Sequence, residues 1–225
     1  MLKLRAKQIL VSVKPSPLFA GMMLTAISFL IYIFQYSGSG NTYAELINSG
    51  VRDITKLSEA LVSDLTGNIG ALVLRLVFSL LNTYISFGLV CYSFRLSSGE
   101  PAVPLQEMFP PVLSFLKFFL LTIITSIVAA IGMLFFIVPG IILALCYSQA
   151  KYIMLDHPEM SVIQCMTASR KLMRGHLGEY FVLVLSFIGW NILTSISVIT
   201  GIWTYPYTGI TMALYYRAVS TEITV

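Results

Sequence analysis

The side chains that enzymes use most often are scarce in this sequence, and several gather in one polar stretch. Both histidines, His157 and His176, lie there, and Asp156 and Glu159 flank His157. These neighbours could form a metal cluster, but adjacent positions on a helix point in different directions, and helix capping accounts for Asp156. Gly-x-Ser-x-Gly, Walker and dinucleotide-binding motifs are absent. We therefore predict that the protein is not an enzyme and holds no metal or cofactor.

The amino-acid composition indicates whether water or lipid surrounds this protein. Of 225 residues, 57% are apolar and only 11% are charged, and the mean hydropathy is +0.85. A soluble domain carries about a quarter of charged residues, so a water-soluble globule is excluded. The numbers predict a polytopic membrane protein surrounded by lipid.

Apolar runs of about 20 residues predict membrane-spanning helices, because lipid offers no partner for backbone amides. The break in the longest run is expected at Val138-Pro139-Gly140. The predicted fold is an all-α, six-helix transmembrane bundle in a single domain, 1–225. The six predicted spans are 18–36, 71–94, 112–136, 141–155, 180–200 and 203–218.

Charge asymmetry predicts the orientation. Most of the fourteen Lys and Arg residues lie in the N-terminal leader or in loops on the same side as the leader. The positive-inside rule then places both termini in the cytoplasm, and the expected location is the bacterial cytoplasmic membrane.

Charged and amide side chains within the spans are the first candidates for binding. Lys117, Lys151 and Arg217 are counted at the cytoplasmic edges of their spans, which leaves Arg75 as the one charge placed within the membrane. Either it reaches the outer interface or it pairs with an anionic ligand. Asn191 belongs to a wider polar set that either joins helices or lines a weakly polar cavity. That set is Asn82, Thr83, Thr122, Thr125, Ser126, Ser186, Asn191 and Thr194.

Residues 41–66 place apolar side chains at intervals of three and four between charged ones, which predicts an amphipathic helix outside the membrane. Its carboxylates outnumber its basic residues. Such a helix either rests on the bundle or the outer leaflet, or forms a recognition surface for an external peptide or partner.

Residues 157–174 predict a second amphipathic helix, at the cytoplasmic interface, with Asp156 as its cap and Gly175 at its end. Arg170, Lys171 and Arg174 supply its positive charge. We expect them to bind anionic lipid headgroups, or a specific lipid or partner. Nothing in the chain indicates nucleic-acid binding.

Residues 137–219 carry an ordered set of motifs. They are Ile137-Val138-Pro139-Gly140-Ile141-Ile142, Tyr147, Tyr152, Asp156-x-Pro158, Ser169-Arg170-Lys171-Leu172-Met173-x-Gly175-His176, Leu185-Ser186-Phe187-Ile188-Gly189-Trp190, Pro206-Tyr207 and Tyr215-Tyr216. This set resembles the bacterial integral membrane family filed as domain of unknown function 975. The resemblance implies a six-span cytoplasmic-membrane protein with no agreed reaction, substrate or cofactor. Some relatives are encoded near peptide-antibiotic or transport functions.

Two hypotheses of function follow. The first is an integral membrane accessory or interaction protein that engages an external peptide, a membrane-protein partner or lipid, with peptide immunity or resistance as one form. The alternative is a component of a small-solute or peptide transporter or channel. The pattern Gly-Ile-x-x-Ala-Leu-x-Tyr begins at Gly140 and recurs at Gly209, which favours paired hairpins of the kind found in transporters.

Overall fold

The structure is a computed structural model that describes residues 2–12, 17–19, 21–30, 33, 69–99 and 109–223. Every regular element in these ranges is a helix, and no strand occurs among them. The predicted all-α class is therefore confirmed for the described part of the chain. The predicted external helix 41–66 lies outside the described residues.

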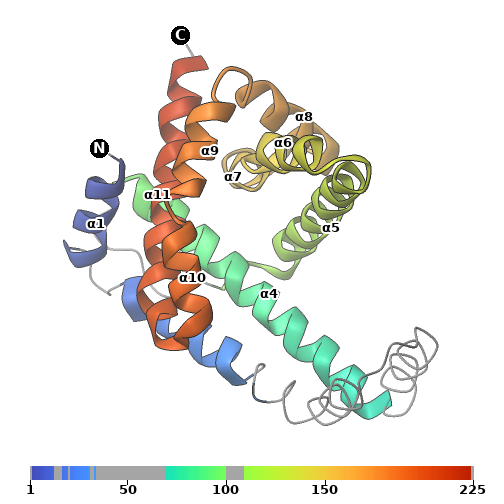
Figure 1. Cartoon of the computed structure of the whole chain (residues 1–225), viewed down its shortest axis with the longest axis vertical. Helices are drawn as coiled ribbons and strands as arrows, with labels where there is room; N and C mark the ends of the chain where they lie inside the picture. Colours follow the sequence, from blue (N-terminus) through green and yellow to red (C-terminus); the bar gives the residue numbers. More distant parts are fainter. Residues whose placement is uncertain are drawn as a thin grey trace.

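The helices form a branched arrangement in which α11 and α4 cross and α5 to α8 stand to one side (Figure 1). In chain order they are α1 (Leu2–Ser12), a helix over Pro17–Leu30, α4 (Ile69–Ser97), α5 (Val112–Phe135), α6 (Ile137–Tyr147), α7 (Ala150–Asp156), α8 (Val162–Leu172), α9 (Leu177–Leu185), α10 (Ile188–Ile196), the 3-10 turn η2 (Val198–Thr200) and α11 (Gly201–Ile223).

Four helices in the described residues are long and apolar enough to cross a membrane. They are Leu76–Ser97, Val112–Phe135, Ile137–Asp156 and Leu177–Ile196. A fifth arises if α1 and the helix over Pro17–Leu30 count as one bent span. The predicted number of six spans is therefore not confirmed.

The predicted sixth span corresponds to α11, which is long enough but too polar to qualify as a span on composition. Residues 210–216 of this helix are all buried. It packs against α4, α1, α8 and α10, so protein rather than lipid surrounds this stretch (Figure 1). A helix enclosed by other helices can carry Thr204 and Thr211, whose hydroxyls each donate to the backbone carbonyl four residues earlier, those of Thr200 and Tyr207.

Helices α5 and α6 form a tight hairpin, of which they are the two arms. The break between them is at Phe136, in extended conformation (φ −159°, ψ 144°), and α6 begins at Ile137 rather than at the predicted residue 141. Pro139 therefore lies in the first turn of α6, where its missing N–H costs nothing. Gly132 and Gly140 face each other so closely that a methyl group on either would meet the other arm.

Helix α8 occupies most of the predicted cytoplasmic helix 157–174, but its cap is different. Ser161 accepts a hydrogen bond from the backbone N–H of Gln164, whose side chain accepts one from the N–H of Ser161. This reciprocal pair satisfies two backbone donors at once, so the prediction that Asp156 caps the helix was wrong. Gly175 has φ +89° in the turn that follows α8, as expected for a residue that ends the helical segment.

Three consecutive residues near the end of α11 hold three other segments. The Tyr215 hydroxyl donates to the carbonyl of His176, before α9, and the Tyr216 hydroxyl donates to Asp156 at the end of α7. Arg217 donates from Nε to the Ser97 hydroxyl, 2.7 Å away at the end of α4. The ends of α4, α7 and the start of α9 are thus fixed to one helix.

Candidate functional site

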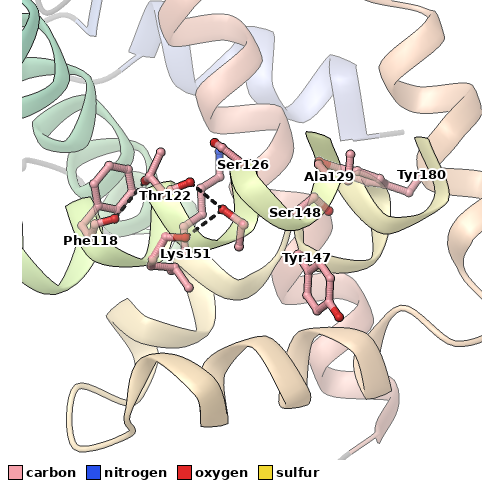
Figure 2. Close-up of a pocket in the computed structure, with 11 residues that line it drawn as sticks. Phe118, Thr122, Ser126, Ala129, Tyr147, Ser148, Lys151 and Tyr180 are labelled. Carbon is pink, nitrogen blue, oxygen red and sulfur yellow. Dashed lines mark hydrogen bonds between the residues drawn. The ribbon is translucent and has the colours of Figure 1, made fainter. Parts of the chain in front are cut away.

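A pocket of about 330 Å³ opens between α5 and the α6–α7 segment, with one side chain from α9 (Figure 2). We call it the Lys151 pocket. Its lining residues are Phe118, Leu121, Thr122, Thr125, Ser126, Ala129, Ala144, Tyr147, Ser148, Lys151 and Tyr180. It lies between two segments that are each apolar and long enough to span a membrane.

The wall from α5 is a stripe of small and hydroxyl side chains. Thr122, Thr125, Ser126 and Ala129 recur at intervals that place them on one face of the helix. The hydroxyls of Thr122 and Thr125 donate to the carbonyls of Phe118 and Leu121 in their own helix, at 2.9 and 2.8 Å. Of the two roles open for these residues, lining a polar cavity is the one found here.

The opposite wall is interrupted where α6 ends and α7 begins. Ser148 and Gln149 form a turn there, and the Ser148 hydroxyl donates to the carbonyl of Leu145. The Ser169 hydroxyl of α8 donates to the Cys146 carbonyl at 2.7 Å, which satisfies one acceptor that the break exposes. Irregular backbone at membrane depth is tolerated where protein or a polar cavity surrounds it.

Lys151 follows this turn, on α7, and is half-buried. Its side chain extends toward the polar face of α5 that bears Thr122 and Ser126 (Figure 2). No carboxylate lines the pocket, and Lys151 forms no ion pair within the described residues. Its ammonium lies 5.1 Å from the centre of the Tyr152 ring. A positive charge thus faces a polar pocket without an acidic neighbour.

A further polar group lies beside the pocket. Gln149 is fully buried, and its Nε2 donates to the Ser148 hydroxyl at 3.1 Å. Its Oε1 has no hydrogen-bond partner among the described residues, which is costly for a buried amide. The turn between α6 and α7, together with Lys151 just after it, therefore combines an ammonium, the Ser148 hydroxyl and an unsatisfied amide oxygen.

The chemistry available here is binding. The Lys151 ammonium can hold an anion, whereas the hydroxyls of Thr122, Thr125 and Ser148 already donate to backbone carbonyls. The apolar side chains Phe118, Leu121, Ala129 and Ala144 can contact a hydrocarbon chain. No group of three or more His, Cys, Asp or Glu in the described residues could hold a metal ion. Burial raises the pKa of the Cys165 thiol, on α8, which disfavours the reactive thiolate.

Of the five binding residues predicted from the sequence, the four whose side chains the structure describes do not line the Lys151 pocket. The side chain of Arg75 lies outside the described residues, and Asn191 is exposed on α10. Arg170, Lys171 and Arg174 are exposed on and just after α8. Of these three, Lys171 lines a separate pocket of about 410 Å³ beside Asp156 and Tyr216.

The sequence prediction missed Lys151, Tyr147 and Tyr180 as site residues, because Lys151 was counted among the charges at the inner edge of a span. One signal could have identified it. In an antiparallel hairpin, positions equally far from the turn face each other. With the turn at Phe136, Thr122 and Lys151 lie 14 and 15 positions from it, and Ser126 and Tyr147 lie 10 and 11, so each pair is nearly level and lines the same pocket.

Comparison with known proteins adds a family. No curated protein and no solved structure matches the chain. The family model described as "Protein of unknown function (DUF975)" matches residues 127–222, which include the pocket residues from Ala144 to Tyr180 but only Ala129 of the α5 wall. The predicted resemblance over 137–219 is confirmed and extends ten residues into the end of α5. Over this C-terminal part, the chain is similar to an uncharacterised family, DUF975.

Proposed function

We propose that the protein is a membrane-embedded binding protein without catalytic activity, which holds an anionic phospholipid headgroup in the Lys151 pocket. The observation that carries this proposal is that the half-buried Lys151 extends toward the hydroxyl-bearing face of α5 in a pocket that no carboxylate lines (Figure 2). A buried cation is costly in a membrane unless a counter-charge approaches it. A phosphate from the surrounding lipid supplies that charge.

The depth of Lys151 supports this choice of ligand. The residue lies five positions before Asp156, the end of the span Ile137–Asp156, or about 7–8 Å along the helix at 1.5 Å per residue. A lysine side chain reaches the headgroup region from this depth. The acyl chain would follow the apolar pocket residues Leu121, Ala129 and Ala144.

The test compares Lys151→Met and Lys151→Arg with wild-type protein in nanodiscs of phosphatidylcholine that contain a small fraction of phosphatidylglycerol. A basic residue near the membrane surface contributes about 1 kcal/mol to binding an anionic lipid, or about fivefold in affinity. Native mass spectrometry should show that Lys151→Met retains correspondingly less phosphatidylglycerol and that Lys151→Arg retains most of it.

Lys117→Met is the matched control, because Lys117 is an exposed lysine of α5 that does not line the Lys151 pocket and donates to the carbonyl of Pro158. The proposal is wrong if Lys151→Met retains as much phosphatidylglycerol as wild type, or if Lys117→Met loses as much as Lys151→Met.

An accessory role in peptide immunity is the form of this proposal that the sequence favours. It assigns recognition to residues 41–66, which lie outside the described residues. Deletion of 41–66 should abolish resistance to a membrane-active peptide while insertion and lipid retention stay normal. Full resistance after the deletion would exclude this form and leave the lipid site untouched.

A transporter or channel component is the second candidate, and two broken spans favour it. Ile137–Asp156 is interrupted at Ser148 and Gln149, and Leu177–Ile196 at Ser186 and Phe187, as in transporters that bind substrate at such breaks. The recurring pattern does not add support, because Gly140 contacts α5 whereas Gly209 contacts Ser93 of α4. Solute flux in proteoliposomes that Lys151→Met abolishes would favour this candidate over a static lipid site.

We also infer a bacterial cytoplasmic membrane with both termini inside. Contacts between helices support a topology in which consecutive spans cross the membrane in opposite directions. Where α4 meets α11, Ser93 is near Gly209 and Ser97 is near Arg217, so these two helices run in the same direction. The segment α9–α10 runs opposite to α11, since Tyr215 contacts His176 and Tyr207 contacts Phe187. Reporter tags at both ends should be protected in intact cells.

A further inference from the structure

We propose that the tip of the α5–α6 hairpin stays among the acyl chains of the leaflet opposite to Asp156 and does not emerge into water. The tip is residues 134–138, which join the two arms. In most multi-pass proteins a loop between two spans carries polar residues across the headgroups. The proposed occupant of this surface is lipid hydrocarbon.

The composition of the hairpin is the first argument. Residues 127–145 contain no polar or charged side chain. The tip side chains are among the most exposed apolar groups in the described part of the chain, with Leu134 at 84%, Phe136 at 74% and Val138 at 66%. An apolar tip of this kind in water would be unfavourable by the hydrophobic effect, whereas lipid hydrocarbon matches it.

The backbone at the turn is the second argument. In hydrocarbon each unpaired amide is costly, so a turn is tolerated there only if few remain. The N–H of Phe136 donates to the carbonyl of Gly132 at 3.1 Å, and the N–H of Gly140 donates to Phe136 at 3.3 Å. Pro139 has no N–H to satisfy. Two of the four N–H groups between Phe136 and Gly140 are therefore paired within the turn.

Length is the third argument. Helix α5 has 24 residues and the span Ile137–Asp156 has 20, which correspond to about 36 and 30 Å. The hydrocarbon core is about 30 Å thick, so both arms reach the far leaflet with little excess. Any excess is accommodated by tilt, since no polar residue holds the tip beyond the headgroups.

The consequence concerns recognition. If the tip is immersed, this hairpin exposes no loop on the far side of the membrane. An external peptide or partner would then have to be recognised by another part of the chain. The inference does not depend on a ligand in the Lys151 pocket.

The test places a single cysteine at Phe136 or at Ser98 in a chain whose Cys91, Cys146 and Cys165 are replaced by alanine. Ser98 is an exposed residue in the turn after α4. Both variants are treated with a membrane-impermeant maleimide in vesicles permeabilised so that both membrane faces are accessible. Ser98→Cys should react readily, and Phe136→Cys should react at least about tenfold more slowly, because thiol labelling needs water. Both should react equally in SDS.

A second measurement avoids the cysteine replacements. The photoreactive residue benzoylphenylalanine replaces Phe136 in the otherwise natural chain, which keeps an aromatic side chain at the tip. Irradiation in phospholipid vesicles should add the mass of a phospholipid to this position. The proposal is overturned by maleimide labelling of Phe136→Cys at the rate of Ser98→Cys. Cross-linking to a second copy of the chain instead of lipid would also overturn it, since the tip would then be an interface between copies.

Discussion

At the scale of single residues, Arg217 shows how a charge is accommodated at the end of a helix. Its guanidinium donates to the hydroxyls of Ser97 and Ser98 and lies 4.5 Å from the centre of the Phe94 ring. Ser97 and Ser98 are at the C-terminal end of α4, where the helix dipole favours a cation. The planar guanidinium serves all three neighbours at once, which an ammonium does not.

We therefore expect Arg217→Gln to destabilise the protein by about 1.5–3 kcal/mol, the usual contribution of hydrogen bonds to a charged group. Thermal unfolding in mild detergent measures this effect. Arg174→Gln is the matched control, because Arg174 is exposed and its loss should change stability by less than about 0.5 kcal/mol. Equal unfolding temperatures for the two variants would show that the contacts of Arg217 contribute little.

At the scale of elements, the α5–α6 hairpin positions the Lys151 pocket. The close approach at Gly132 and Gly140 sets how the two arms face each other, and this alignment places Lys151 opposite Thr122. In a membrane, small residues allow such approach and dispersion forces then hold the helices. The turn at Ser148 and Gln149 adds the second bend, which directs α7 toward α8 and α11.

Gly140→Ala tests this element. A methyl group at Gly140 would lie 2.6 Å from the backbone nitrogen of Met133 and 2.8 Å from its Cα, so the arms must separate. We expect a loss of about 1–3 kcal/mol of stability, typical of overpacking. Lipid retention at Lys151 should fall with it.

Gly178→Ala is the control for Gly140→Ala, since nothing lies within 4 Å of a methyl group there. Alanine is also the better helix former, so this variant should be neutral or slightly more stable. If Gly140→Ala unfolds at the same temperature as Gly178→Ala, the close approach of the arms does not define the hairpin.

At the scale of the whole molecule, the polar and apolar surfaces are distributed as expected for a protein in lipid. Helix α5, the most apolar of the candidate spans in the described residues, exposes large side chains along most of its length, whereas the more polar α11 is enclosed. The core around α11 combines stacked rings of Phe94, Tyr152 and Tyr216 with buried aliphatic residues. Apolar helices such as α5 can face lipid without a cost in free energy, because lipid is itself apolar. The enclosed helix α11 contacts protein instead, so it can carry polar groups.

Two isoleucines distinguish these environments. Ile210 is 0% exposed within the core, and Ile127 on α5 is 51% exposed. Ile210→Ala should cost about 2–5 kcal/mol, because it leaves a cavity among packed side chains. Ile127→Ala should cost much less, since lipid fills the space. Unfolding in mixed micelles of mild detergent and SDS measures the stability of the two variants. Equal losses of stability would show that α11 is not the packed centre of the protein.

Several features were determined by the sequence alone. Composition and apolar runs predicted an all-helical chain with apolar, span-length helices, because backbone groups in lipid must pair within their own segment whatever their neighbours are. The motifs over 137–219 were enough to indicate the family that matches 127–222. Helix α8 also lies where local polarity placed it.

The remaining features depend on tertiary structure. Three such features are the turn at Phe136 rather than at Pro139, the cap at Ser161, and the enclosure of α11. In each case the local sequence allows another structure equally well, and contacts or caps in the fold select the one observed. Lys151 is the main example. A lysine at the cytoplasmic edge of a span and a lysine in a pocket have the same sequence pattern. Only the alignment of two helix faces, through Gly132 and Gly140, brings Lys151 to Thr122 and Ser126. Such alignment is a property of packing between segments, which local sequence patterns do not encode.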